Sequence, residues 1–166
     1  MRINEIDIEN IKIALFDFDD TLAIHKDKDF SKHRKESEEK RLGYYLNAYK
    51  YPDTFYEDIE PCIKSDILYN FINELRNRNI KIYCLSGMKN SFHLKAKQNF
   101  VSKHYGDDIE VLSTTTQESK IDGVKIIQML YNCNLDEMIF IDDSKNTIEH
   151  LKNNGVKAFD VNELEE

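Results

Sequence analysis

Two short apolar runs of this sequence each end on clustered carboxylates. The run IALF is followed by Asp17, Asp19 and Asp20, and the run MIFI is followed by Asp142 and Asp143. Like charges held close together are costly unless another charge neutralises them, and a bound cation commonly does so. The two clusters therefore predict a metal site, provided that the fold brings the ends of the two runs together.

Carboxylates that converge from separate strands make a hard oxygen site that suits Mg²⁺. This ion prefers octahedral coordination and keeps several waters, so one or two carboxylates and a phosphate complete its shell. Asp17 and Asp143 are the expected carboxylates. Side chains alternate along extended backbone, which would point Asp17 and Asp19 the same way. One carboxylate can then attack phosphorus while the other handles a proton, an established route through a covalent carboxyl phosphate.

A second group of polar residues has the types needed to hold a phosphate. Ser86 and the amides of Gly87 and Met88 fall at an expected strand-to-helix turn, where N–H groups can cradle phosphate oxygens. Lys120 would offset the charge of the phosphate and the carboxylates. The structural alternatives are ordinary, because Ser-Gly turns after strands are common and most lysines solvate a helix face. The histidines, including His93, lack the spacing of metal ligands and are expected at the surface.

Alternating strands and helices must position these residues. Short apolar runs without helical periodicity predict buried strands at 11–16, 80–85, 109–112, 138–141 and 156–159. Apolar spacing and end signals predict helices that begin at Ser65 as the N-cap and over about 90–104, 120–132 and 145–153. This order implies an α/β fold with a doubly wound parallel sheet and helices on both faces. Ligands of such sheets bind outside the carboxyl ends of the strands, where the acids and Ser86 fall.

Composition indicates one compact domain in a reducing compartment. The 166 residues are 40% hydrophobic with only five Gly and two Pro, which allows a sizeable core with a small insertion. A net charge of −8 argues against an extended nucleic-acid-binding surface. Three cysteines without a CxxC pair favour neither a disulfide framework nor a zinc ribbon, so a cytoplasmic location is expected. The sequence has no apolar leader and no run of ~18 apolar residues, so no membrane partner is expected.

The order and spacing of these residues resemble the four motifs of the haloacid dehalogenase (HAD) superfamily. DFDDT at 17–21, the strand-ending Ser86, Lys120 before a helix and IDDS at 141–144 look like motifs I to IV, in the family's order and across the whole chain. Members with a second Asp two positions after the first are mainly phosphatases. One departure is Asp20, which stands where glycine is frequent.

The resemblance implies a role for each matching residue of the catalytic and phosphate-binding groups. Asp17 would be the phosphate-accepting nucleophile. Asp19 would be the general acid toward the leaving group and then the general base for water. Thr21 and Ser86 would hold phosphate oxygens or position the nucleophile loop, and Lys120 would bridge the nucleophile and the phosphate.

The resemblance also implies a Mg²⁺ shell built from acids of both clusters. Asp17 would contribute its carboxylate and Asp19 its backbone carbonyl. Asp143 would be the direct ligand from the second cluster, and Asp142 would hold a metal-bound water or orient its neighbour.

The composition changes between motifs I and II. Residues 25–41 carry charges of both signs, and the residues after them are dense in aromatic side chains. In the family an insertion at this place forms a cap, so we expect residues 24–63 to form a small helical cap on a core of residues 1–23 and 64–166. The aromatic residues could stack on a base or ring of the substrate, or seal the cap onto the core. They are Tyr44, Tyr45, Tyr49, Tyr51, Phe55 and Tyr56.

The resemblance implies a Mg²⁺-dependent phosphohydrolase that cleaves a phosphomonoester through an aspartyl-phosphate intermediate. The expected partner is a small phosphorylated substrate, with nucleotides, nucleic-acid 3′-phosphate ends and sugar phosphates all open. Two alternatives belong to other classes: a phosphoryl-accepting module like a response-regulator receiver, and a family member without catalysis that only binds a partner. Receivers carry their acid pair near the N-terminus, whereas here the pair comes late in the chain.

Overall fold

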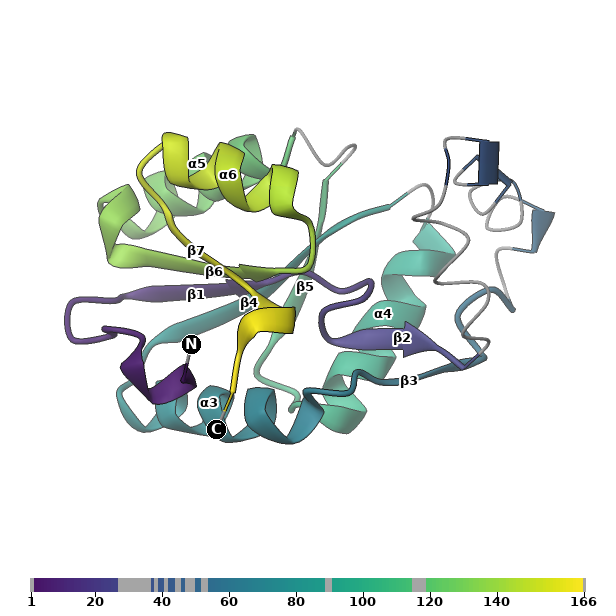
Figure 1. The fold of residues 1–166 in the computed structure, drawn as a ribbon, viewed down its shortest axis with the longest axis horizontal. Helices are drawn as coiled ribbons and strands as arrows, with labels where there is room; N and C mark the ends of the chain where they lie inside the picture. Colours follow the sequence, from purple (N-terminus) through teal and green to yellow (C-terminus); the bar gives the residue numbers. More distant parts are fainter. Residues whose placement is uncertain are drawn as a thin grey trace.

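Five parallel strands form the centre of the structure, and helices cover both faces of the sheet (Figure 1). The computed structural model describes residues 2–26, 37, 39–40, 42–43, 46, 50–51, 54–88, 91–114 and 119–165. The strands of this sheet are β1 (Ile13–Phe16), β4 (Lys81–Gly87), β5 (Glu110–Thr114), β6 (Met138–Asp142) and β7 (Lys157–Asp160). The helices are α3 (Ser65–Asn77), α4 (Ser91–His104), α5 (Lys120–Tyr131) and α6 (Lys145–Asn153). The predicted α/β class with a doubly wound parallel sheet is confirmed.

The boundaries of these elements lie within two residues of those predicted from the sequence. The predicted N-cap is one residue off, because Ser65 is the first helical residue of α3 and Lys64 occupies the cap position. Short 3₁₀ turns are added at Ile3–Glu5, Leu135–Glu137 and Val161–Glu163. Within the described ranges, no helix combines the length and the apolar character needed to cross a bilayer.

The strand order places the carboxyl ends of β1 and β6 at a change of winding direction. The order across the sheet is β5-β4-β1-β6-β7, and every neighbouring pair is parallel. Numbered along the chain, these strands follow the order 3-2-1-4-5, which is that of a Rossmann-type sheet, whereas receivers have the order 2-1-3-4-5. The chain therefore winds outward from β1 through β4 and β5 and returns to the other side of β1 with β6. Ligands of open α/β sheets bind at such a switch point.

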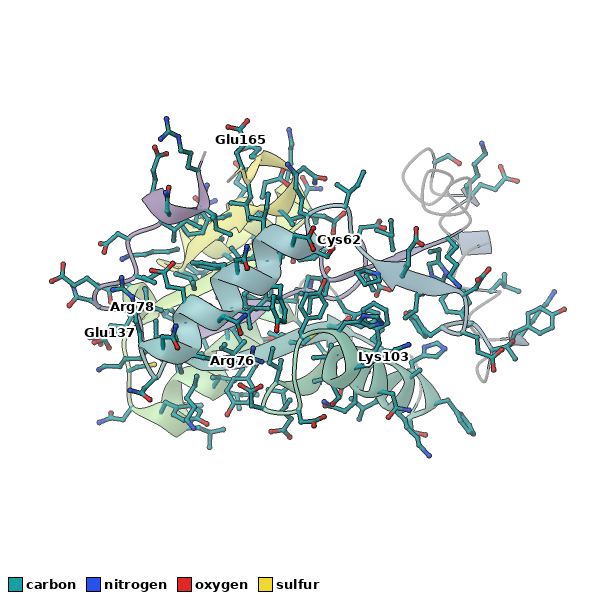
Figure 2. The ribbon with its side chains drawn as sticks, turned by 90° about the horizontal axis from the view of Figure 1, so that it is seen from below. Cys62, Arg76, Arg78, Lys103, Glu137 and Glu165 are labelled. Carbon is teal, nitrogen blue, oxygen red and sulfur yellow. The ribbon has the colours of Figure 1, made fainter. Side chains whose placement is uncertain are left out.

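The sheet separates two apolar layers, and the alternation of β1 divides its side chains between them. Ala14 and Phe16 pack in the layer of α3 and α4, whereas Ile13 and Leu15 pack in the layer of α5 and α6. All four side chains are fully buried, as expected for a central parallel strand that is covered on both faces. Figure 2 views the molecule from the side of helix α3, which contains Arg76.

A short antiparallel pair that was not predicted stands where the chain enters and leaves the predicted insertion. Strand β2 (Ala23–His25) pairs with β3 (Ile59–Pro61), and the backbone N–H of Cys62 donates to Leu22 O at 3.2 Å. Each strand has three residues, most of them half-buried, so neither shows the alternation that predicts a strand. The division into a core and a cap of residues 24–63 stays a prediction.

The aromatic residues at the end of the predicted insertion pack against the core. Phe55 and Tyr56 are each 9% exposed, and their ring centroids lie 4.9 Å apart. His93 of α4 contacts both rings and is 2% exposed, so its predicted place at the surface is wrong. The spacing of the histidines excluded a metal role but carried no information about burial. Tyr51 is exposed. Three further tyrosines of the predicted cap lie outside the described residues: Tyr44, Tyr45 and Tyr49.

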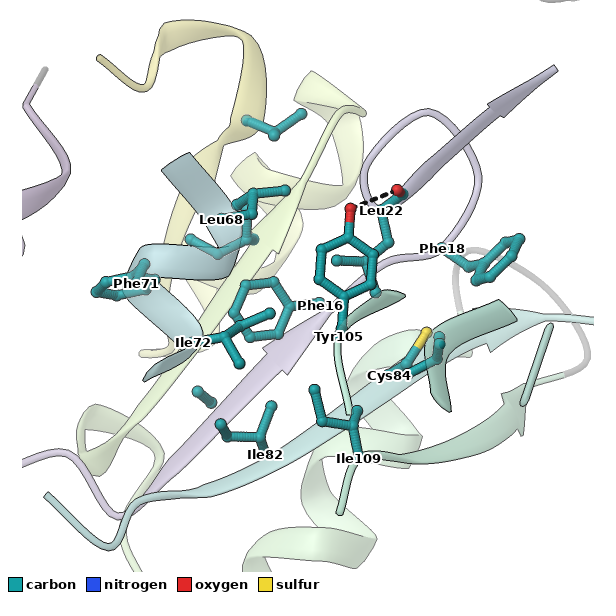
Figure 3. Packing of buried hydrophobic residues seen from close by; sticks show 14 of the residues in the cluster. Phe16, Phe18, Leu22, Leu68, Phe71, Ile72, Ile82, Cys84, Tyr105 and Ile109 are labelled. Atoms are coloured by element: carbon teal, nitrogen blue, oxygen red, sulfur yellow. Dashed lines mark hydrogen bonds between the residues drawn. The ribbon is translucent and has the colours of Figure 1, made fainter. Parts of the chain in front are cut away.

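A buried tyrosine ties the end of α4 to the loop that follows β1. Tyr105 is 2% exposed, and its hydroxyl donates to Leu22 O at 2.8 Å (Figure 3). Burial raises the pKa of Tyr105 far above its ordinary value, so the hydroxyl keeps the proton that it donates. The loop that carries the first acid cluster is thereby held from the α4 side of the sheet.

Replacing this hydroxyl should cost a small, measurable part of the stability. We expect Tyr105→Phe to lower the free energy of unfolding by about 1 kcal/mol, because a buried hydrogen bond is lost while Leu22 O keeps the N–H of Cys62. Urea unfolding of Tyr105→Phe should be compared with that of Tyr69→Phe, whose side chain is 48% exposed. Equal stability of the two variants would show that the bond contributes nothing.

Candidate active site

The carboxyl ends of β1 and β6 bring three acids of the two clusters together. Asp17 directly follows β1, and its backbone N–H donates to Ile141 O at 2.9 Å, which continues the pairing of the two strands. One carboxylate oxygen from each of Asp17, Asp142 and Asp143 lies within 4.8 Å of the other two. Asp17 and Asp142 are buried, whereas Asp143 is partly exposed. The arrangement concentrates negative charge at the switch point of the sheet.

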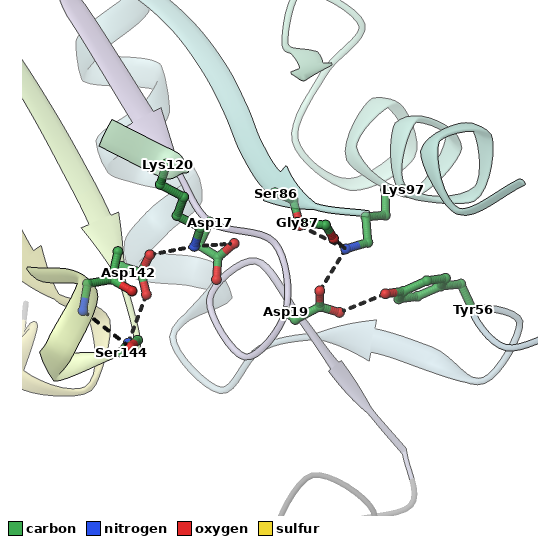
Figure 4. Close-up of polar contacts among 10 residues, drawn as sticks. Asp17, Asp19, Tyr56, Ser86, Gly87, Lys97, Lys120, Asp142 and Ser144 are labelled. Atoms are coloured by element: carbon green, nitrogen blue, oxygen red, sulfur yellow. Dashed lines mark hydrogen bonds and ion pairs between the residues drawn. The ribbon is translucent and has the colours of Figure 1, made fainter. Parts of the chain in front are cut away.

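A buried lysine lies between two of these acids (Figure 4). Lys120, the first residue of α5, places its Nζ 2.9 Å from Asp17 Oδ1 and 2.7 Å from Asp142 Oδ2. Burial lowers the pKa of Lys120, but the charges of Asp17 and Asp142 outweigh it and raise the pKa above the ordinary value. Lys120 is therefore an ammonium shared by two carboxylates.

Asp142 shows that this one ammonium does not neutralise the cluster. Burial, followed by the charge of Asp17, raises the pKa of Asp142 to about 7. Lys120 and the backbone N–H of Ser144, which donates to Asp142 Oδ1 at 2.8 Å, oppose the rise without cancelling it. Three carboxylates around one ammonium leave an excess of negative charge. Clustered carboxylate oxygens with such an excess fit a hard divalent cation such as Mg²⁺.

The carboxylate of Asp19 stands outside this cluster. Strand β1 ends at Phe16, so the extended alternation that would point Asp17 and Asp19 the same way does not continue. The chain instead turns: the backbone N–H groups of Leu22 and Ala23 both donate to Phe18 O at 3.0 Å. The contribution of the Asp19 backbone carbonyl to a metal stays a prediction.

Two residues of this turn explain features of the motif. Asp20 has a φ of 61°, in the left-handed region that glycine adopts freely and Asp tolerates. Glycine, which is frequent at this position in the family that the motifs resemble, adopts this conformation more easily than Asp does. Thr21 is fully buried, and its Oγ1 is the sole buried side-chain nitrogen or oxygen without a hydrogen-bond partner in the part of the chain that the structure describes. A buried polar atom of this kind has the capacity to bond a water or a ligand atom.

Ser86 and Gly87, the predicted phosphate-binding pair, end strand β4. Ser86 is fully buried, and its Oγ accepts a hydrogen bond from Lys97 Nζ at 2.8 Å. Its own O–H hydrogen is then available for a phosphate oxygen. The Met88 amide cannot serve as expected, because it donates to Thr114 O at 3.0 Å and extends the pairing of β4 with β5.

Lys97 was not predicted from the sequence, although it links Asp19 to the end of β4 (Figure 4). It lies in α4 and is fully buried, with Nζ 2.6 Å from Asp19 Oδ2 and 3.3 Å from Gly87 O. The hydroxyl of Tyr56 donates to the other oxygen of Asp19 at 3.2 Å. A signal was present, because His93, Lys97 and Val101 recur at helical spacing on the buried face of α4.

Comparisons with known proteins identify the fold. No protein-family model matches the chain, and no curated protein matches it by sequence. A HAD family enzyme from Bacteroides thetaiotaomicron, in complex with magnesium and inorganic phosphate, is 16% identical with a TM-score of 0.56 over 90% of this chain and 93% of that chain. The phospho-aspartyl intermediate analogue of phosphoserine phosphatase is 20% identical with a TM-score of 0.59 over 89% of this chain and 85% of that chain.

A third structure matches over part of its length. The N-terminal part of a Bacteroides fragilis protein, which contains a phosphatase domain and is complexed with Mg, is 18% identical with a TM-score of 0.57. The match covers 90% of this chain but only 35% of that one. At these identities the likeness concerns the fold. The chain has the fold of the HAD family, as the resemblance of its motifs implied.

The raised pKa of Asp142 should make the metal-free protein less stable as the pH rises. Between the ordinary Asp pKa, about 3.9, and the folded value of about 7, the folded state binds more protons than the unfolded state. The free energy of unfolding then falls as pH increases through this window. We expect it to fall by about 1–3 kcal/mol more between pH 5 and 8 in the wild type than in Asp142→Asn. Urea unfolding with a chelator measures the difference, and parallel profiles would contradict the assignment.

Mg²⁺ should stabilise the folded protein through the acid cluster. At a concentration 100 times its dissociation constant, a ligand that binds only the folded state contributes about 2.7 kcal/mol. We expect Mg²⁺ to raise the melting temperature of the wild type and of Asp107→Asn, whose exposed side chain lies outside the cluster. Asp143→Asn should lose most of the shift. An equal shift in Asp143→Asn would place the ion elsewhere.

Proposed function

We propose that this chain is a Mg²⁺-dependent phosphohydrolase that cleaves a phosphomonoester through a covalent phosphate on Asp17. The observation that carries the proposal is the convergence of Asp17, Asp142 and Asp143, with Lys120 between two of them. A second carboxylate, Asp19, follows two residues later and is held beside Ser86 by Lys97. The fold shared with HAD phosphatases supports the same conclusion.

In the first half-reaction, a carboxylate oxygen of Asp17 attacks phosphorus. The Asp17 O–P bond forms while the bond from phosphorus to the leaving oxygen breaks. Protonated Asp19 gives its proton to that oxygen, so an alcohol leaves and Asp19 becomes a carboxylate. Because Asp17 is part of the site, its attack on the bound substrate is effectively a unimolecular step.

In the second half-reaction, water releases the phosphate. Asp19 takes a proton from water, the water oxygen attacks phosphorus, and the Asp17 O–P bond breaks. Inorganic phosphate leaves, Asp17 is again a carboxylate and Asp19 is again protonated. The two residues thus return to their starting states after one turnover.

The surrounding residues hold the phosphate and balance its charge. Lys120 already contacts Asp17 and lies where it can also meet a phosphoryl oxygen of the bound substrate. The hydroxyls of Thr21 and Ser86 are the proposed donors to the other phosphate oxygens, and the partnerless Oγ1 of Thr21 supports this role. Mg²⁺ held by Asp17, Asp142 and Asp143 would supply positive charge against the phosphate.

The proposed substrate is a small phosphorylated molecule, with nucleotides, nucleic-acid 3′-phosphate ends and sugar phosphates as the classes to test. A panel of these three classes, assayed by phosphate release, would separate them. The location of the protein in the cytoplasm stays a prediction.

Hydrolysis of an aryl phosphate tests the proposed reaction. We expect Mg²⁺-dependent turnover whose kcat falls to background in Asp17→Asn and by about 10²–10⁴-fold in Asp19→Asn, because Asp19 is also the base that activates water in the second half-reaction. Fluoroberyllate or vanadate should inhibit the wild type. Asp107→Asn is the matched control and should keep full activity.

The alternative classes predict other outcomes of the same assay. A receiver-like module would accept a phosphoryl group and retain it without turnover, and its strand order differs from that found here. An inactive binding protein would neither accept nor release phosphate. Either result with the Mg²⁺-loaded wild type would overturn the proposed reaction.

A further inference from the structure

We propose that Lys97 and Tyr56 are positioning residues that hold the carboxylate of Asp19 for its acid and base steps. This inference rests on the proposed function, because it assigns a task to residues around the proposed acid–base group. It also gives the segment that leads out of the predicted insertion a part in positioning the proposed acid–base group. Neither residue belongs to the four motifs.

The ammonium of Lys97 is buried, and its neighbours compensate the charge. An ammonium taken out of water is costly unless it is paired and hydrogen-bonded. Lys97 is fully buried, and its Nζ lies 4.9 Å from the ring centroids of both Phe18 and Tyr56. Aromatic faces attract a cation, but they are weaker partners than a carboxylate. The partner that compensates the charge is Asp19 at 2.6 Å, in the states of the proposed reaction in which Asp19 is a carboxylate.

The ammonium of Lys97 has its hydrogen-bonding capacity filled. Lysine has three N–H donors, and Lys97 has three acceptors: Asp19 Oδ2 at 2.6 Å, Ser86 Oγ at 2.8 Å and Gly87 O at 3.3 Å. No donor remains for a phosphate oxygen in this arrangement. Lys97 therefore acts on the reaction through Asp19 and Ser86, rather than as a phosphate ligand.

Asp19 is held at both carboxylate oxygens. Lys97 engages Oδ2 and the hydroxyl of Tyr56 engages Oδ1, which fixes the plane of the carboxylate (Figure 4). The side chain is still 18% exposed, whereas that of Lys97 is not exposed at all. Each carboxylate oxygen can accept more than one hydrogen bond, so both remain able to exchange a proton with a leaving group or a water.

Tyr56 connects this carboxylate to the predicted insertion. It lies three residues before β3, and its ring packs against Phe18 at a centroid distance of 5.8 Å and against His93 at 5.1 Å. These contacts place its hydroxyl independently of the carboxylate that it binds. The position of Asp19 thus depends on how the segment before β3 packs onto α4.

Loss of this positioning should show in steps that need proton transfer. A misplacement of about 1 Å can cost about 10²-fold in rate. Departure of an alkoxide depends strongly on protonation by Asp19, whereas a nitrophenolate leaves readily without it. The release of phosphate by water is common to both substrates, whereas kcat/KM reports the first half-reaction alone. A defect in holding Asp19 should therefore lower kcat/KM more for an alkyl phosphate than for a nitrophenyl phosphate. A defect in phosphate binding would be the same for both.

The experiment is a double-mutant cycle on Lys97 and Asp19 with both substrates. We expect Lys97→Met to lower kcat/KM on an alkyl phosphate by about 10–10²-fold and to have a smaller effect on kcat/KM for nitrophenyl phosphate. In an Asp19→Asn background, Lys97→Met should cause a much smaller loss, because only its contact with Ser86 remains to be removed. Lys95→Met, an exposed lysine of the same helix, is the matched control and should keep wild-type rates. Equal losses of kcat/KM on both substrates, or losses that multiply in full with those of Asp19→Asn, would overturn the inference.

Tyr56→Phe tests the second contact while keeping the ring. We expect a loss in the same direction but smaller than that of Lys97→Met, with fluoroberyllate affinity unchanged because Asp17 and Lys120 are untouched. Tyr69→Phe is the control for removal of an exposed hydroxyl. Thermal unfolding of each variant separates loss of folding from loss of positioning. A wild-type rate for Tyr56→Phe would remove this residue from the proposal.

A readout that needs neither metal nor turnover keeps the inference separate from the proposed function. The side-chain ¹⁵N resonance of Lys97 in the metal-free protein can be assigned by its absence in Lys97→Met. We expect Asp19→Asn and Tyr56→Phe to shift it, and Asp107→Asn to leave it unchanged. An unshifted resonance in Asp19→Asn would overturn the contact even in an active enzyme. An inactive wild type with the expected shift would instead overturn the proposed reaction.

Discussion

The ammonium of Lys120 makes the acid cluster compatible with a folded chain. Asp17 and Asp142 stand at the ends of neighbouring parallel strands, so the pairing of β1 with β6 brings their carboxylates together. Both are buried, and water cannot screen their repulsion. Lys120 contacts both, and its own burial is tolerable only because they are charged. A single ammonium leaves negative charge uncompensated, which is the property that a divalent cation and a phosphate can use.

Much of this arrangement could be predicted from the sequence, because the runs before Asp17 and Asp142 are apolar at every position. Such runs fit strands buried on both faces of a parallel sheet, and the carboxyl ends of those strands share one edge. The path of the chain after a strand is harder to predict. The alternation expected for Asp17 and Asp19 assumed extended backbone, but β1 ends at Phe16 and the next residues form a turn. The pair β2 and β3 was missed because three-residue strands carry no periodicity.

Lys97 shows why a site residue can stay hidden in a sequence. Lysines on helices are mostly exposed, and α4 contains Lys95 and Lys103 as well, both of which are exposed. Only the helical register separates them, since Lys97 shares its face with the buried residues His93 and Val101. The helical register indicates that Lys97 is buried, but it does not indicate which residue Lys97 contacts. The contact with Asp19 depends on how α4 packs across the end of β4, which no local pattern records.

The two buried lysines divide the site between the two helix layers. Lys120 comes from α5 and holds Asp17, whereas Lys97 comes from α4 on the opposite face and holds Asp19. Figure 4 shows the two carboxylates turned toward different lysines, although they are two residues apart in sequence. In the proposed reaction, the nucleophile is held entirely by the sheet and α5, and the acid–base group is shared between α4 and the segment before β3. Changes in the predicted insertion would then alter proton transfer to the leaving group. The residues that hold the nucleophile belong to the core and would stay unchanged.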